Sequence, residues 1–143
     1  NGVSVDMTPD ELAAFEAQRV FNLPQAKRYM RLRIMARRER AELGGFLNGS
    51  TRYDSDAQSL SRISILASRA RTGKASGSNI VVSMVAADDS MTNMNADALL
   101  SLELSAGDHF IACSNNARVL RLAVNQADTV GAVLAVDTEA GWP

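Results

Sequence analysis

The sequence predicts a mainly α-helical, α+β fold: a small helical domain with one or two short β-hairpins and one long amphipathic helix. Apolar residues recur at three- and four-residue steps from Leu99 to Val124, which indicates one continuous helix with an apolar stripe. Asn48-Gly49 lies between two short β-prone segments, a pattern typical of a tight hairpin. With 143 residues, 46% of them hydrophobic, the chain can bury a core without disulfide bonds.

Two helices are predicted in the first third of the chain. Thr8, Pro9 and Glu11 match an N-cap, a first-turn proline and a capping-box acid, so a helix should run from there to about Asn22. Pro24 should open a second helix that ends at the glycine pair 44–45. That helix is rich in arginine and poor in apolar residues, so we expect it to be solvated or to lie along a partner.

A hairpin and a third helix follow. Residues 45–54 predict two strands joined by a type I′ turn at Asn48-Gly49. Ser55 and Gln58 resemble a second capping box, opening a helix whose apolar positions run from Leu60 to Ala70. The segment 73–78 is rich in Gly, Ser and Ala, and predicts a flexible connector near residues 72–79.

The last part of the chain predicts a second hairpin, the long helix and a short tail helix. Residues 80–85 and 91–94 read as strands joined by a turn at Asp88-Asp89, and Asn95 should cap a helix running to about Asn125. In the tail, Asp128 or Thr129 should open an apolar helix that Gly141 ends. Trp142, the sole tryptophan, is expected to pin the end of the segment onto the core.

Charge is distributed unevenly along the chain. Residues 1–71 carry 12 basic and 8 acidic groups, and residues 72–143 carry 3 basic and 8 acidic groups, giving nets of +4 and −5. The two halves therefore suit self-docking or head-to-tail contact between copies, or they are simply solvated differently. A total net charge of −1 argues against a nucleic-acid partner, and the chain has no apolar run long enough to predict a membrane span.

The candidate chemical sites are weak. His109 and Cys113 lie four residues apart on one helix face, a spacing that suits two metal ligands, but the sequence has no other His or Cys. Cys113 also belongs to the apolar stripe, where a thiol packs as a small hydrophobic group. Gly73-Lys74 lacks the remaining residues of a phosphate-binding loop. We therefore predict no catalytic residues, no cofactor and no metal, and a protein that is not an enzyme.

Partner contacts are the remaining function that the residues suggest. The basic side chains of residues 27–40 spread around the helix instead of forming one stripe, which favours a solvated helix or one crossing an acidic partner surface over a phosphate-binding face. The predicted contact residues are Arg31, Arg33, Arg37, Arg38 and Trp142.

The order of these elements is similar to a known family. An arginine-rich helix leads to Gly44-Gly45-Phe46-Leu47-Asn48-Gly49 and then Tyr53-Asp54-Ser55-Asp56; later come Asp88-Asp89-Ser90, the segment Met94 to Leu99, and Gly141-Trp142-Pro143. Over residues 30–143 this order resembles a domain of unknown function found near the carboxyl end of tail and tail-fibre proteins of tailed bacteriophages. The resemblance supplies no catalytic residues.

The resemblance implies a structural component of a bacteriophage tail, a tail fibre or a fibre- or baseplate-associated protein, acting through protein–protein contacts. It implies other phage tail proteins as partners, allows a homotrimer, and places the protein in the virion after synthesis in the cytoplasm of the bacterial host. Residues 1–23 would be a leader or arm and residues 24–143 the tail-associated domain. One alternative is a tail-fibre assembly chaperone that is not retained in the virion. A more remote alternative is a fragment of a host enzyme.

Overall fold

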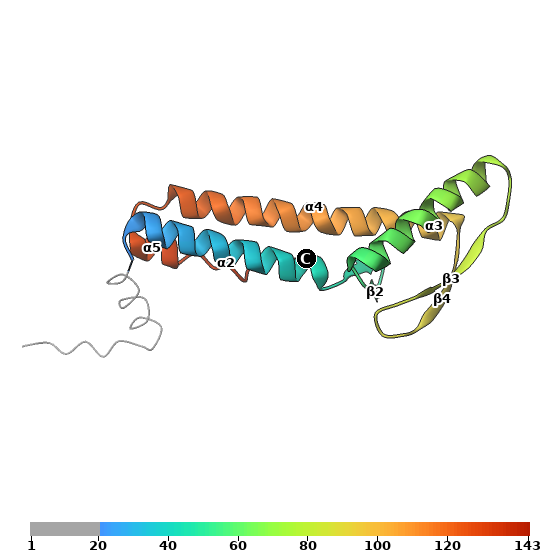
Figure 1. The fold of residues 1–143 in the computed structure, drawn as a ribbon, viewed down its shortest axis with the longest axis horizontal. Helices are drawn as coiled ribbons and strands as arrows, with labels where there is room; N and C mark the ends of the chain where they lie inside the picture. The colour runs from blue at the N-terminus through green and yellow to red at the C-terminus, as the bar shows by residue number, and fades with distance from the viewer. Residues whose placement is uncertain (1–20) are drawn as a thin grey trace, which may run out of the picture. The chain divides into compact units, whose positions relative to one another are not determined.

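The computed structural model describes residues 21–143, and within them it contains four helices and two two-stranded antiparallel sheets (Figure 1). The predicted α+β class is confirmed. The elements in chain order are α2 (Leu23–Leu43), β1 (Phe46–Asn48), β2 (Thr51–Tyr53), α3 (Ala57–Ala75), β3 (Val81–Val85), β4 (Met91–Asn95), α4 (Ala96–Gln126) and α5 (Val130–Leu134). The described residues form two compact units: unit 1 is residues 21–37 with Asn116–Gly141, and unit 2 is Arg38–Asn115 with Trp142–Pro143.

Helix α2 begins and ends close to the predicted positions. Asn22 and Gln25 exchange hydrogen bonds between side chain and backbone amide, both 3.0 Å long, which caps the first turn. At the other end Gly45 takes a positive φ of 82°, as expected for a glycine that follows a helix. The helix predicted over residues 8–22 lies outside the described residues except for Phe21 and Asn22, which are not helical.

The first hairpin is present, but its predicted turn type is wrong. Asn48 pairs with Thr51, so the two central turn residues are Gly49 and Ser50, not Asn48 and Gly49. Gly49 has a φ of 62°, while Ser50 is not among the described residues with positive φ. A positive φ at the first central residue alone fits a type II′ turn. The Asn48 side chain is engaged elsewhere, since its Oδ1 accepts hydrogen bonds from the Ser101 and Ser105 hydroxyls of α4.

The cap of α3 also differs from the predicted one by one residue. Asp56, not Ser55, is the N-cap, and its carboxylate accepts hydrogen bonds from the backbone amides of Gln58 and Ser59. Ser55 is buried and ties the end of α2 to the hairpin: its hydroxyl donates to the Glu42 carbonyl (2.5 Å) and accepts from the Gly45 amide (2.9 Å). With the Ser55 hydroxyl engaged in these two bonds, the Asp56 carboxylate takes the exposed cap position.

Helix α3 continues through Ala75, so it includes the first residues of the segment predicted as a connector. Gly73 is buried there, and a Cβ on it would clash with Ile80 Cδ1, so the missing side chain makes room for the residue that precedes β3. The core of unit 2 joins both hairpins, α3 and the first half of α4; its buried members include Phe46, Tyr53, Ile63, Ala70, Met84, Met94, Leu99 and Leu102.

The second hairpin and α4 match the predicted pattern. Strands β3 and β4 pair in register, from Val81 with Asn95 to Val85 with Met91, around a turn in which Asp89 has a φ of 63°. Asn95 Oδ1 accepts the Ala98 amide at the start of α4. Along α4 the predicted stripe is buried or half-buried throughout, and Leu102, Cys113 and Val124 are fully enclosed.

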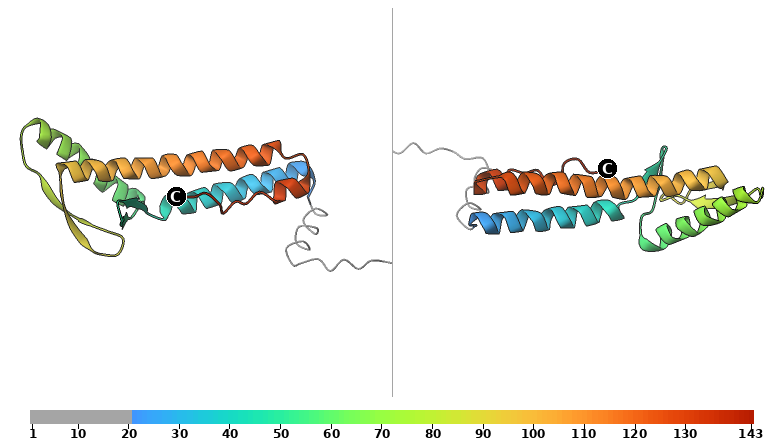
Figure 2. Two further views of the ribbon diagram at one scale, coloured as in Figure 1. Left: turned by 180° about the vertical axis from the view of Figure 1, so that it is seen from behind. Right: turned by 90° about the horizontal axis from the view of Figure 1, so that it is seen from above.

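In unit 1 the first part of α2 and the last part of α4 run side by side in opposite directions, and α5 folds back after them (Figures 1 and 2). Ala26, Met30 and Ile34 of α2, with Ala117 and Val124 of α4 and Val133 of α5, are its buried apolar side chains. Thr129, one of the two residues predicted to open this helix, is the N-cap of α5. Gly141 does not end this helix, because α5 stops at Leu134. No helix in the described part of the chain is long and apolar enough to cross a membrane.

Candidate protein-contact groove

The four predicted contact arginines of α2 largely engage their own chain. Arg31 donates from Nε (3.1 Å) and from its second terminal nitrogen (2.6 Å) to Asn125 Oδ1, and Lys27 Nζ donates to the Asn125 carbonyl (2.7 Å). The last turn of α4 contains no basic residue. Lys27 and Arg31 of α2 therefore supply the positive charge that interacts favourably with the negative end of the α4 dipole. Their positions therefore stabilise the helix pair in unit 1.

The other predicted arginines have separate neighbours. The Arg33 guanidinium lies 6.0 Å from the centre of the Tyr29 ring, and the Phe21 ring stacks on Tyr29 with 5.3 Å between the ring centres. Arg38 pairs with Glu42 one turn further along α2, in unit 2. A role of these arginines in binding a partner stays a prediction.

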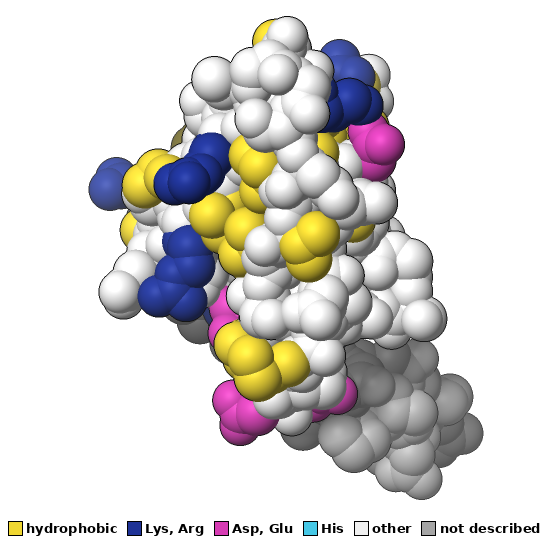
Figure 3. Space-filling view, turned by 90° about the vertical axis from the view of Figure 1, so that its right-hand side faces the viewer, with side chains coloured by type: hydrophobic (Ala, Val, Ile, Leu, Met, Phe, Trp, Pro, Cys, Tyr) yellow, Lys and Arg dark blue, Asp and Glu magenta, His cyan; other side chains and the backbone are white. Residues whose placement is uncertain are grey.

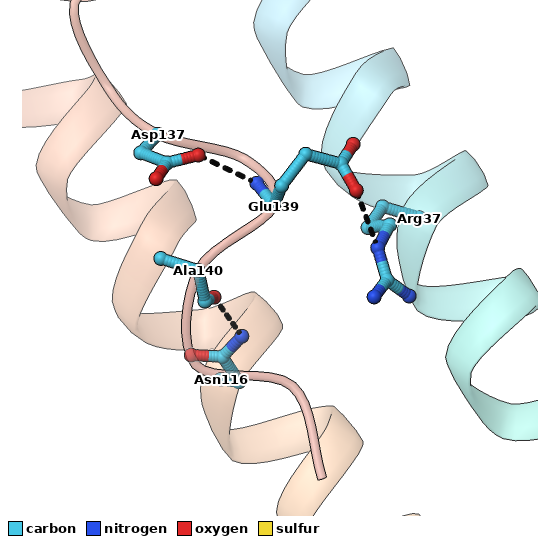
Figure 4. A network of polar contacts seen from close by, with 5 residues as sticks. All are labelled: Arg37, Asn116, Asp137, Glu139 and Ala140. Carbon is cyan, nitrogen blue, oxygen red and sulfur yellow. Dashed lines mark hydrogen bonds and ion pairs between the residues drawn. The ribbon is translucent and has the colours of Figure 1, made fainter.

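Arg37 holds the C-terminal tail of unit 1 (Figure 4). Its Nε donates to Glu139 Oε2 at 2.7 Å, while the Glu139 amide donates to Asp137 Oδ1 at 2.9 Å. From the other side, Asn116 Nδ2 of α4 donates to the Ala140 carbonyl at 2.9 Å. The tail is therefore attached to both α2 and α4 in unit 1.

Beside these contacts, unit 1 carries a shallow open groove between α2 and α4, called here the basic groove. It is lined by Arg28, Arg31, Leu32, Met35 and Arg121. Leu32 and Met35 are 52% and 54% exposed, which leaves apolar surface in water among three guanidinium groups. Arginine and methionine are enriched at protein interfaces, and arginine is frequent among the residues that contribute most to binding, so the groove is suited to a protein partner.

Only part of the groove could be predicted from the sequence. The arginine-rich character of α2 is visible in the sequence, but no sequence pattern connects Leu32 and Met35 with Arg121, which is distant in sequence and comes from another helix. The available signal was that Leu32 and Met35 lie off the Ala26, Met30 and Ile34 stripe that α2 buries. An apolar pair on a second helix face indicates a second contact.

Trp142 is half-buried in unit 2, and its predicted contact with a partner stays a prediction. Next to it, Pro143 lines a hollow with Phe46, Arg52 and His109. The end of the described chain therefore lies against the first hairpin and α4 within unit 2.

His109 and Cys113 are adjacent, and the ring nitrogen nearest the thiol is already engaged in a hydrogen bond. His109 Nε2 lies 3.0 Å from the Ala41 carbonyl oxygen and therefore donates its hydrogen there, and the same nitrogen is 3.8 Å from Cys113 Sγ. A nitrogen that donates to a carbonyl has no lone pair for a metal ion. Among residues 21–143, no three His, Cys, Asp or Glu side chains gather into a possible metal site.

Two aspartates have perturbed acidity for structural reasons. The Ser59 hydroxyl, and then its amide, lower the pKa of Asp56 at the start of α3. The Ser90 hydroxyl, and then its amide, lower the pKa of Asp88 in the β3–β4 turn. Both carboxylates accept hydrogen bonds that favour the charged form, which is what a cap and a turn require.

Unit 2 also leaves apolar side chains in contact with water. Exposed ones lie on α3 (Ile65), β3 (Val81, Val85), β4 (Met91) and the first half of α4 (Leu104, Ile111). On the side that carries α3 and the β3–β4 hairpin, hydrophobic side chains stand among basic and acidic ones (Figure 3). The unit therefore offers surface for contacts of its own.

Comparison with known proteins identifies the family of this chain. No curated protein and no solved structure matched the chain. A family model does match residues 25–140, most of the chain and parts of both units. The boundaries agree closely with the start of α2 and with the tail contacts at Glu139 and Ala140. The chain belongs to the family described as domain of unknown function DUF4376.

Proposed function

We propose that this chain is a structural component of a tailed-bacteriophage tail, as part of a tail fibre or of a fibre- or baseplate-associated protein, and acts through protein–protein contacts. It would be made in the cytoplasm of the bacterial host and carried in the virion. The phage assignment is supported by the order of motifs from the arginine-rich helix to Gly141-Trp142-Pro143. The contact role is supported by a separate observation, the basic groove of unit 1.

The groove favours an acidic protein surface with apolar groups of its own. Removing the exposed side chains of Leu32 and Met35 from water would favour binding of a partner, by roughly 25 cal/mol per Å² of apolar area buried. Arg28, Arg31 and Arg121 surround them and would attract carboxylates, which speeds association and selects against basic partners.

Two measurements test the proposal. Mass spectrometry of purified virions from the phage that encodes this chain should detect it. Absence from virions, with presence in infected cells, would instead favour the tail-fibre assembly chaperone. Absence from both, or expression by uninfected cells without a prophage, would refute the phage assignment.

A variant tests the groove itself. Leu32→Gln together with Met35→Gln removes the apolar part of the groove but keeps a good helix-forming residue at both positions. Phage carrying it should assemble fewer complete tails. The matched control is Leu43→Gln with Leu122→Gln, which changes two helix positions of similar exposure (60% and 54%) outside the groove lining and should leave assembly unchanged.

A further inference from the structure

We infer that the partner of the basic groove is a second copy of this chain, which presents the outer side of α4 in unit 2. The inference rests on the proposed function in one respect, that the groove is a protein-contact site. It adds the identity of the partner and the surface that the partner uses.

The outer side of α4 is called here the acidic face, after the carboxylates at its edges. Its centre carries exposed apolar side chains, although α4 already buries its opposite side. Leu104 and Ile111 are 66% and 60% exposed, and Gly107 lies between them on the same side of the helix. A Cβ at Gly107 would have open space around it, so the helix backbone is accessible to an incoming side chain there. The acidic face therefore has a shallow depression at Gly107, between the side chains of Leu104 and Ile111.

The charges at the edges of the acidic face are mainly negative. Glu103 and Asp108 flank the apolar residues, and Arg71 of α3 pairs with Glu103. The basic groove carries three guanidinium groups and no carboxylate among its lining residues. The two surfaces thus match in the two properties that decide docking: each has an apolar centre, and their edges have opposite net charge.

A contact between two different surfaces of the same chain is heterologous. Each copy can give its acidic face to one neighbour and receive another neighbour's acidic face in its groove. Such contacts continue into a filament unless the rotation between copies closes a ring, of which a trimer is one case. The net charges of the two halves of the sequence, +4 before residue 72 and −5 from there on, agree with this pairing of a basic surface with an acidic one.

Mixing two variants of the full chain tests this arrangement. The groove variant is Leu32→Gln with Met35→Gln, and the face variant is Leu104→Gln with Ile111→Gln. Sedimentation velocity at concentrations up to about 1 mM should show association of the parent and a rise of about tenfold or more in the dissociation constant of each variant alone. A mixture of the two variants should form a one-to-one dimer and nothing larger, because the face variant keeps an intact groove and the groove variant keeps an intact face.

Controls separate this result from other causes. The Leu43→Gln, Leu122→Gln variant should associate like the parent, and all variants should keep the helical circular dichroism of the parent. Raising the salt concentration should weaken the parent's association, because the charged edges are exposed to solvent. A monomeric parent throughout the range overturns the inference, as does a mixture that gives no dimer while the parent associates.

The outcome is independent of the virion measurement. A chain found in virions that does not associate with itself would keep the proposed function and remove this inference. A chain that forms the mixed dimer but is absent from virions would do the reverse.

Discussion

Replacing Gly45 by alanine should destabilise unit 2 far more than replacing Gly49. Both glycines have positive φ, 82° and 62°, a conformation that costs an L-residue about 1–2 kcal/mol. A Cβ at Gly45 would also lie 2.8 Å from the Tyr53 carbonyl oxygen, whereas one at Gly49 would meet nothing within 4 Å. The two variants therefore share the backbone cost and differ in the steric one.

The steric cost at Gly45 is large because neither partner can move freely. Tyr53 is buried and paired with Phe46, and Gly45 donates its amide to the Ser55 hydroxyl. Overpacking of this kind costs about 1–3 kcal/mol. Alanine also lowers the entropy of the unfolded chain, which returns about 0.4–1 kcal/mol in either variant. We expect a loss of about 2–4 kcal/mol for Gly45→Ala and of about 1 kcal/mol for Gly49→Ala.

The assay is urea denaturation followed by the fluorescence of Trp142, the only tryptophan, which lies in unit 2 with both glycines. Gly77→Ala is a further control, since Gly77 has a φ of 71° and its Cβ would also be unobstructed. If Gly45→Ala unfolds at the same urea concentration as Gly49→Ala, the contact with Tyr53 does not limit the site and the reasoning is wrong.

Three further predictions concern single groups. Cys113→Ala should cost about 1–2 kcal/mol of stability because the thiol is fully buried, and a thiol reagent should label native Cys113 slowly; rapid labelling would contradict its burial. Thr129→Ala should cost about 1 kcal/mol by removing the N-cap of α5, whereas Thr129→Ser should restore it, as denaturation of unit 1 would show. Asp56 and Asp88 have pKa values below the ordinary 3.8, so the stability they provide is present above that pH and is lost as the pH falls through their folded values. Asp56→Asn should flatten the fall in thermal midpoint below about pH 4, and an unchanged profile would count against that carboxylate.

Local signals in the sequence predicted the elements well, and failures arose where a residue had two possible partners. Asn48-Gly49 indicated a hairpin correctly, but the register between β1 and β2 moved the turn by one residue because Asn48 is held by Ser101 and Ser105. Ser55 was a reasonable cap until Glu42 and Gly45, brought close by the fold, engaged its hydroxyl. Local chemistry offers both options, and contacts distant in sequence choose between them.

The candidate site was harder to predict for the same reason. The arginines of α2 were visible, yet their partners Asn125 and Glu139 lie 94–102 residues further along the chain. The basic groove requires Arg121 to face Leu32 and Met35 across two helices, which helical periodicity alone does not reveal. The burial of Cys113 followed directly from its place in a periodic stripe, since that property depends on one helix only.

The way the chain passes through its two units bears on how it is made. Unit 2 is built chiefly from one continuous stretch, 38–115, while unit 1 joins segments from both sides of that stretch. The bonds of Lys27 with Asn125 and of Arg37 with Glu139 span 98 and 102 residues, so they cannot form on the ribosome until the tail has emerged. Unit 2 can fold first and bring the two ends of unit 1 closer, which reduces the entropy lost on closing so long a loop. During synthesis, Leu32 and Met35 would then be exposed together with the apolar side of α2 until residues 116–139 have emerged, a period when a chaperone or a neighbouring copy could bind them.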